Sequence, residues 1–285
     1  MAETLISPGV LALENDNSFV SSQPITVGAA IIGPTVKGPV ETPTVVRSYS
    51  DYQNKFGTTF LSASQVYTYF TSIAAFNYFN NGGQTLLVTR VVSGTFSPAT
   101  TATASVTGPV GGGVTILNSA SLAQALVLTT LSEGGVMNSS SSLDISGSLS
   151  SGTTDNIRWQ ITNPDSSAGT FNLLIRQGDD NANTPIVLET WTNLSMDPTA
   201  PNYVARVLGN QTKTYNAVDN QVEIGGDYPN NSRYVYVASV NTPTPLYFDN
   251  NGQAKPAFTG SLPAAGSGSF TGAAGSLAIA DGYKV

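Results

Sequence analysis

One stretch, residues 25–92, constrains the fold of this chain most, because short apolar runs alternate there with segments of helical pattern. Residues 27–32 form an apolar run that a Gly-Pro pair ends, which is typical of a buried strand. Residues 44–49 and 85–92 are rich in β-branched side chains and predict two further strands. Strands that flank a helix in this order predict an α/β unit with a crossover between them.

A short helix is predicted for residues 50–56, between the second and third of these strands. We expect Ser50 to be its N-cap, Asp51 to lie in its positively polarised first turn, and Gly57 to follow its end. Each residue type suits its place, because Ser caps backbone N–H groups and Gly ends helices without steric cost.

A longer helix is predicted for residues 64–79, and the run Asn-Asn-Gly-Gly at 80–83 should end it. Helical spacing places one apolar, aromatic-rich stripe on this helix. The stripe that we expect to face the sheet consists of Val66, Phe70, Ile73 and Asn77. Such a stripe could line a ligand pocket, but large aromatic side chains at helical spacing more often form ordinary core.

Composition excludes several classes of function. The chain of 285 residues has a net charge of −7, so a surface that binds phosphate or nucleic acid is not expected. It has no cysteine and no histidine, which excludes disulfides, thiolate nucleophiles, the Ser-His-Asp triad and the common zinc motifs. Charged residues make up only 10%, and this low fraction favours a surface that meets other protein surfaces. We therefore expect no enzyme and no cofactor.

A metal site was weighed at residues 179–183. Asp179, Asn181 and Asn183 match the first three ligand positions of a calcium loop, but Thr184 stands where glycine is needed. No glutamate occupies the twelfth position either, so a solvated turn is favoured and no metal is expected. No apolar run approaches the length of a membrane span, so direct membrane insertion is not expected.

The chain is predicted to have an α+β fold, with an α/β core unit, a β-rich insertion and an extended N-terminal arm. We assign residues 1–20 to the arm, 21–94 to the α/β core unit and 95–240 to the β-rich insertion or outer domain. We assign residues 241–285 to a connector toward a C-terminal region that is absent here. Within it, residues 260–275 are rich in Gly, Ser and Ala, which predicts a flexible segment.

The N-terminal arm is the candidate interaction site. Pro8-Gly9 breaks any helix, and Val10, Leu11 and Leu13 form a short apolar patch with the pattern of a strand. A strand of this size cannot bury its side chains alone, so it should pair with a sheet. That sheet belongs either to its own domain or, by strand addition, to a neighbouring subunit.

Two blocks of motifs carry a resemblance to a known family. The first block consists of Ser7-Pro8-Gly9-Val10, Gly33-Pro34, Lys37-Gly38-Pro39-Val40, SYSDYQNKFG at 48–57, FNNGG at 79–83 and VTRV at 88–91. The second consists of ETW at 189–191, NLSMDP at 193–198, NYV at 202–204 and VL at 207–208. In this order, the two blocks resemble the tail sheath proteins of contractile phage tails and related injection machines.

The resemblance implies a structural subunit that polymerises helically around a tail tube and contracts to drive the tube through the host envelope, without catalysis. It implies as partners copies of this chain, the tail tube protein, the baseplate and the tail terminator, in a virion tail assembled in the host cytoplasm. It also implies strand exchange with a neighbour through the arm. The residues so implicated are Ser7, Pro8, Gly9, Val10, Leu11 and Leu13.

Two alternatives remain open at this point. One is another β-rich virion or surface assembly protein, such as a baseplate component or an adhesin, and the other is a hydrolase that uses carboxylates. Sheath proteins normally continue into a C-terminal α/β region, and the resemblance therefore implies that this chain is a fragment or is completed by a second chain.

Overall fold

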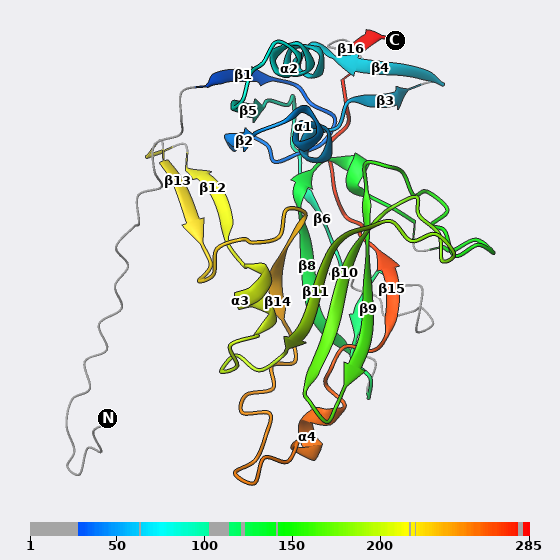
Figure 1. Cartoon of the computed structure of the whole chain (residues 1–285), viewed down its shortest axis with the longest axis vertical. Helices are drawn as coiled ribbons and strands as arrows, with labels where there is room; N and C mark the ends of the chain where they lie inside the picture. The colour runs from blue at the N-terminus through cyan, green and yellow to red at the C-terminus, as the bar shows by residue number, and fades with distance from the viewer. Residues whose placement is uncertain are drawn as a thin grey trace.

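The computed structural model describes residues 28–62, 64–102, 114–120, 123–140, 142–216, 218–219, 221–278 and 282–285. Figure 1 shows a small upper unit, which holds helices α1 and α2, above a larger unit built mainly of strands. Mixed sheets with few helices give an α+β fold, and this fold class is confirmed. The six arm residues Ser7, Pro8, Gly9, Val10, Leu11 and Leu13 lie outside the described residues.

The upper unit is organised by a three-stranded sheet of order β1-β5-β2, with β1 at Ala29–Gly33, β5 at Leu86–Arg90 and β2 at Thr44–Val46. β1 runs parallel to β5, and β2 runs antiparallel to it. All three strands were predicted from their apolar runs. The prediction of a buried first strand was wrong, because β1 is an edge strand and Ile32 is 73% exposed.

Helix α1, Tyr49–Phe56, begins one residue before the predicted start. Its N-cap is Ser48 and not Ser50, because the Ser48 side chain accepts a hydrogen bond from the Asp51 N–H at 3.1 Å. Asp51 lies in the first turn as expected and forms an ion pair with Lys55 at 3.0 Å. Gly57 is the C-cap with φ of 70°, a conformation that glycine adopts without strain.

Helix α2, Phe70–Asn80, is shorter than predicted, because residues before it form strand β4, Gln65–Tyr69. This strand lies between β3, Thr59–Ser62, and β16, Gly282–Lys284, in a second sheet of the upper unit. Residues 65–69 form a strand and not the predicted helix, because alternation places Tyr67 and Tyr69 on one face, where both stack on Phe60 of β3.

The prediction that this stripe faces the sheet was therefore wrong. The buried face of α2 consists of Thr71, Ser72 and Ala75. These small side chains let the helix approach the sheet closely, whereas Phe70 is 65% exposed. The aromatic side chains predicted as core thus lie in part on the surface of the molecule.

The lower unit packs two sheets face to face. One has the order β11-β10-β9-β15, with β9 at Ile157–Asp165, β10 at Thr170–Gln177 and β11 at Val187–Ser195. The other has the order β14-β8-β6, with β7 paired to β8. Its strands are β6 at Pro98–Thr100, β7 at Ile116–Leu117, β8 at Gln124–Glu133 and β14 at Val235–Val240.

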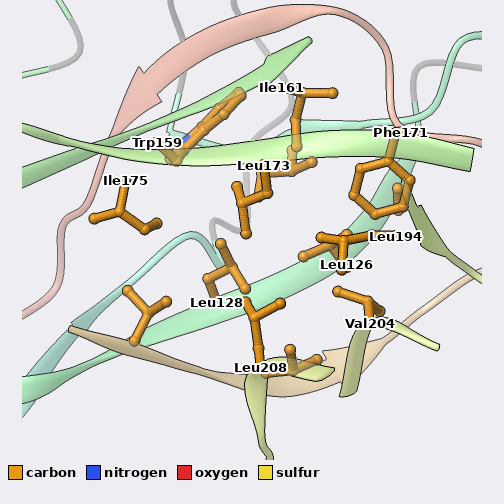
Figure 2. Close-up of a cluster of buried hydrophobic side chains, with 14 of the residues drawn as sticks. Leu126, Leu128, Trp159, Ile161, Phe171, Leu173, Ile175, Leu194, Val204 and Leu208 are labelled. Carbon is orange, nitrogen blue, oxygen red and sulfur yellow. The ribbon is translucent and has the colours of Figure 1, made fainter. Parts of the chain in front are cut away.

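The main core lies between these two sheets (Figure 2). Leu126 and Leu128 of β8 lie opposite Ile161 of β9 and Leu173 of β10 (Figure 2). Burial of this apolar surface is the principal stabilising term for the fold. The remaining elements are η1 at Gly135–Met137, α3 at Val204–Leu208, α4 at Pro256–Thr259 and the hairpin of β12, Thr212–Asn216, with β13, Gln221–Gly225.

The segment predicted as a flexible connector is instead part of both units. β15, Gly266–Ser269, pairs with β9, and Phe270 after it is fully buried. In this pairing Gly268 lies opposite Trp159, so a residue without a side chain sits beside a large indole. β16 pairs with β4 and brings the last described residues back to the upper unit. The Gly/Ser composition thus reflects close strand packing and not a loose linker.

Candidate assembly surface

Two motifs of the first block, KGPV at 37–40 and VTRV at 88–91, meet at one buried arginine. Arg90, at the end of β5, donates to the carbonyls of Gly38 at 2.8 Å, Glu133 at 2.7 Å and Val36 at 3.4 Å. Its guanidinium also lies 5.0 Å from the centre of the Phe96 ring. Arg90 therefore ties β5, the loop at 36–40 and the end of β8 together, and so joins the upper unit to the lower one.

Backbone carbonyl oxygens stabilise the charge of the buried Arg90 guanidinium. Burial lowers the pKa of Arg90 to about 10, and the nearby Glu133 carboxylate opposes this shift. Burial in turn raises the pKa of Glu133, against the influence of Arg90. A buried charge without a bidentate carboxylate partner costs stability, so this residue is a point where the two units depend on each other.

Two glycines of the motifs allow the loop at 36–40 to close on α1. Gly38 has φ of +111°, and a Cβ there would lie 2.6 Å from Phe56 Cδ1. A Cβ at Gly57 would lie 2.9 Å from Val36 Cβ. Residues 36–38 and 56–57 thus pack closely against each other.

The second motif block organises a turn beside the lower core. The Asp197 carboxylate accepts hydrogen bonds from the Thr199 N–H at 2.9 Å and the Tyr247 N–H at 2.8 Å. Burial alone would raise the pKa of Asp197, but these hydrogen bonds, with one from the Thr199 hydroxyl, outweigh it and lower the pKa. The turn leads into α3, whose Val204 and Leu208 are fully buried in the main core.

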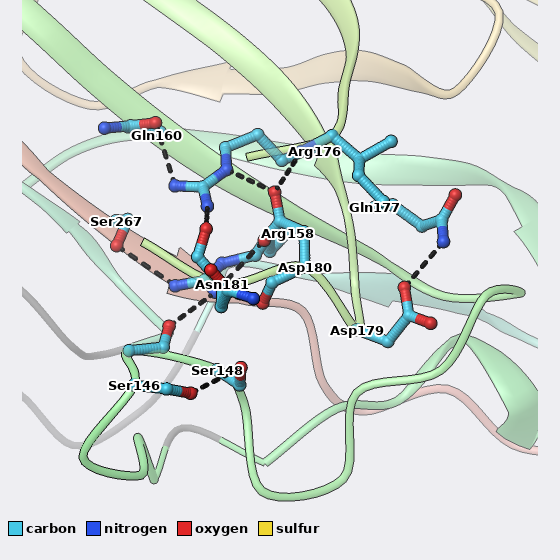
Figure 3. A network of polar contacts seen from close by, with 12 residues as sticks. Ser146, Ser148, Arg158, Gln160, Arg176, Gln177, Asp179, Asp180, Asn181 and Ser267 are labelled. Atoms are coloured by element: carbon cyan, nitrogen blue, oxygen red, sulfur yellow. Dashed lines mark hydrogen bonds and ion pairs between the residues drawn. The ribbon is translucent and has the colours of Figure 1, made fainter. Parts of the chain in front are cut away.

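The turn at residues 179–183, weighed above for calcium, is organised around Asp180. Asp180, next to Asp179, has a fully buried side chain that pairs with two arginines (Figure 3). Its carboxylate accepts from Arg176 Nε at 2.6 Å and from Arg158 Nη1 at 3.3 Å. Within the described ranges, no group of three acidic side chains could hold a metal ion. Asp180 holds this turn to β9 and β10 through its two arginine partners.

One face of the upper sheet is covered and the other is not. On the covered face, Leu86 and Val88 of β5 pack with Tyr52 of α1 and Ala75 of α2. The strand register places Ala30 and Ile32 with Leu87 and Thr89 on the opposite face, which neither helix covers. These residues, with Val45 of β2, form what we call the open face.

The outer edge of β1 borders this open face. Among the described residues, β1 pairs only with β5, so one side of its backbone is available to a further strand. Parallel strands are normally covered on both faces, and unpaired strand edges readily add a strand from another chain. The combination of an open face with an open edge is typical of an interface.

A second apolar surface lies on the β16-β4-β3 sheet at the same end of the molecule. Leu61 and Val66 are cross-strand partners, and Phe70 lies with its ring 6.0 Å from that of Tyr283. All of them are exposed, Leu61 by 76%. We call this set the outer patch: Leu61, Val66, Phe70, Tyr283 and Val285. Exposed apolar patches of this kind mark sites of protein association.

Neither apolar surface was predicted from the sequence. The open face requires the strand order, and the outer patch requires β16, which lies more than two hundred residues after β4. A period-two pattern at 65–69 was the one local signal that could have revealed the exposed side chains. No helix in the described part of the chain is long and apolar enough to cross a membrane.

Comparison with known proteins gives a distant likeness. No family model and no curated protein matches the sequence. The fold is similar to that of a sheath tail protein from Listeria innocua, with a TM-score of 0.40 and 10% identity over 89% of this chain and 36% of that chain.

A second solved structure, a sheath tail protein from Desulfitobacterium hafniense, matches with a TM-score of 0.29 and 13% identity over 81% of this chain and 39% of that chain. The present chain thus spans less than two fifths of the length of these two proteins.

Proposed function

We propose that this chain is a structural subunit of a contractile tail sheath, which polymerises helically around a tail tube. The observation that carries the proposal is the open face of the β1-β5-β2 sheet with its open edge. It lies in the same unit as Arg90, which joins two motifs of the first block, KGPV at 37–40 and VTRV at 88–91. A neighbouring subunit would supply the missing cover.

The physical reason is that a single copy leaves apolar side chains of the upper unit exposed to water. Its helices cover one face of the sheet, and its apolar side chains Ile32 and Phe70 remain in water. Burying such side chains between copies stabilises an assembly by about 25 cal/mol per Å² of apolar area. An array that repeats this contact at every subunit gains this stabilisation many times.

Contraction in this proposal is a change between two packings of nearly rigid subunits. The free-energy difference between the extended and contracted arrays supplies the work, and no nucleotide is required. The subunit would contact the tail tube protein on the inside of the array and the baseplate and tail terminator at its ends. The setting would be a virion tail.

The N-terminal arm would connect neighbouring subunits in both states. Val10, Leu11 and Leu13 would enter the sheet of an adjacent copy after a bend at Pro8-Gly9. Among the described strands only β5 pairs with β1, so the outer edge of β1 offers N–H and C=O groups to such a strand. A strand connection of this kind can follow a rigid-body motion that breaks flat contacts.

Deletion of residues 1–17 tests this function. We expect the truncated chain to keep its folded core, because no described element is removed, and to remain monomeric. Sedimentation and electron microscopy measure the assembly, and circular dichroism measures the fold. As a matched control, replacement of Val10, Leu11 and Leu13 by Ser keeps the length and should also abolish assembly. Normal polymerisation of both variants would contradict the role of the arm.

A further inference from the structure

The hairpin of β12 and β13 stands apart from the two packed sheets of the lower unit (Figure 1). Among the described strands, β12 and β13 pair only with each other. Val218, in the turn between them, is 88% exposed, and Val222 and Ile224 of β13 are exposed too. A two-stranded hairpin without a covering layer is only marginally stable in water, so a further surface is needed to cover it.

Two asparagines tie the base of this hairpin to the rest of the chain. The Asn230 side chain accepts from the Gln211 N–H at 2.9 Å and donates to the Gln211 carbonyl at 2.6 Å. The Asn210 side chain accepts from the Tyr228 N–H at 2.8 Å. Because both strands are tied at the base, the hairpin keeps its direction relative to the molecule.

The turn end of the hairpin is acidic. Asn216 Nδ2 donates to the Asp219 carboxylate at 3.1 Å and to the Glu223 carboxylate at 2.7 Å, so one amide holds two carboxylates close together. Both acids are exposed, and neither forms an ion pair with a described residue. We call this end of the hairpin the acidic tip: Val218, Asp219 and Glu223.

Basic side chains gather elsewhere, beside β2 and α1. A cavity of about 550 Å³ is lined by Arg47, Lys55 and Arg233, and an adjoining cavity of about 430 Å³ shares the last two and adds Lys213. Lys55 pairs with Asp51, but the other three cations are exposed and form no ion pair with a described residue. We call this set the basic groove: Arg47, Lys55, Lys213 and Arg233.

The acidic tip lies outside the basic groove of its own copy. Thr212 and Lys213, at the start of β12, line the second cavity, but no described residue from 214 to 228 lines either cavity. A strand rises about 3.4 Å per residue, so Asn216 lies roughly 14 Å along the strand from Thr212. The hairpin therefore carries its two acids away from the groove at its base.

We propose that the basic groove binds the acidic tip of a second copy of this chain. Copies with a net charge of −7 repel one another, so association requires a place where opposite charges meet, and the groove holds four of the eleven Lys and Arg. Leu131, Tyr234 and Tyr236 also line the second cavity and offer an apolar wall to Val218.

This contact rests on the proposed function, because the second copy is the neighbour in a repeating array. Tip and groove are different surfaces of one molecule, so the contact is head-to-tail. Each copy then presents a free tip and a free groove to the next copies, as an open helical array requires.

Cross-linking tests the contact, because the chain has no cysteine of its own. One variant carries Ser50→Cys in the wall of the groove, and the other carries Val218→Cys at the tip. A short bismaleimide should join the two variants with a yield at least roughly tenfold above that for Val218→Cys mixed with Ser166→Cys. Ser166 is the matched control, since it is exposed in the turn between β9 and β10.

Charge reversal separates electrostatic docking from chance contact. Arg47→Glu and Arg233→Glu, added to the groove variant, should lower the yield of the cross-link about tenfold. Asp219→Lys and Glu223→Lys, added to the tip variant, should then restore it, because opposite charges meet again. Restoration is a result that a merely damaged fold would not give.

Two further controls complete the test. Lys255→Glu and Lys284→Glu change the net charge equally, away from the groove, and should leave the yield unchanged, and urea midpoints check that each variant is folded. Equal yields with the groove variant and with Ser166→Cys overturn the contact, and so does a yield that charge reversal leaves unchanged. Normal sheaths without this cross-link contradict the contact alone. A cross-link in a chain that never polymerises contradicts the proposed function and supports the contact.

Discussion

A single carboxylate, that of Asp180, holds two buried arginines in the lower unit. Arg158 of β9 and Arg176 of β10 both contact it, and Arg158 also reaches the Ser267 hydroxyl of β15 at 3.2 Å (Figure 3). The Ile186 N–H donates to the same carboxylate at 2.9 Å. One side chain thereby links three strands of a sheet to the turn before β11. The sequence placed Asp180 in a polar turn and could not reveal this, because both arginines come from strands.

Replacement of Asp180 by Asn is expected to destabilise the fold by about 3–5 kcal/mol, because it leaves two buried cations without their counter-charge. Urea unfolding followed by circular dichroism measures the loss. Asp179→Asn is the matched control, since Asp179 is exposed and should change stability by no more than about 0.5 kcal/mol. Equal losses for the two variants would contradict the buried pair as the cause.

At the scale of elements, the sequence predicted β1, β2 and β5 and misplaced the boundary between β4 and α2. The segment 65–69 fits both a helical and a strand pattern, and stacking of its tyrosines on Phe60 decides in favour of the strand. The Ser-x-x-Asp spacing that begins at Ser48 indicated the correct N-cap, since an acid three residues after a Ser is typical of a helix start.

This boundary changes the expected effect of Phe70→Ala. A buried aromatic would cost about 3–5 kcal/mol, but Phe70 lies on the exposed outer patch, so the loss in the monomer should stay below about 1 kcal/mol. Phe171→Ala, at a fully buried core position, is the matched control and should show the full loss. Urea unfolding measures both variants.

The same Phe70→Ala variant should assemble poorly if the outer patch contacts a neighbour, and sedimentation at equal concentration measures this. A large loss of monomer stability would mean that Phe70 packs inside its own chain. Normal stability together with normal assembly would remove the outer patch from the interface.

At the scale of the whole molecule, the parts that the sequence could not predict are those that depend on distant contacts. One cavity is lined by both Arg47 and Arg233, which lie far apart in the sequence. The Gly/Ser composition of β15 gives no strand pattern, so the sequence could not predict this strand. The pKa values of the tyrosines belong to this scale too. Burial raises the pKa of several of them: Tyr52, Tyr203, Tyr234, Tyr236 and Tyr247.

These tyrosines predict a loss of stability at alkaline pH. Above pH about 10, the unfolded chain releases tyrosine protons that the folded chain retains, so the free energy of unfolding falls as pH rises. Arg90 acts in the opposite direction, because its lowered pKa of about 10 makes the folded chain release a proton first. Because five tyrosines have a raised pKa and only one arginine has a lowered pKa, the free energy of unfolding should fall overall as pH rises.

Urea midpoints at pH 8.5 and pH 10.5 measure this effect, and the midpoint should be lower at the higher pH. Tyr52→Phe removes the hydroxyl with the largest upward shift and should make the fall smaller. A midpoint that rises between these two pH values would mean that Arg90 dominates.

The pairing of β16 with β4 has a consequence for the order of events during synthesis. The outer patch acquires Tyr283 from β16 and Val285 from the residue after it, whereas Leu61 and Val66 belong to β3 and β4, near the start of the described chain. A ribosome needs on the order of 10–40 s to make the roughly 190 residues between β5 and β16 at 5–20 residues per second. Until then the second sheet of the upper unit lacks one strand. Because this surface is complete only after nearly all of the described chain has been made, we expect any association through the outer patch to follow translation of the subunit.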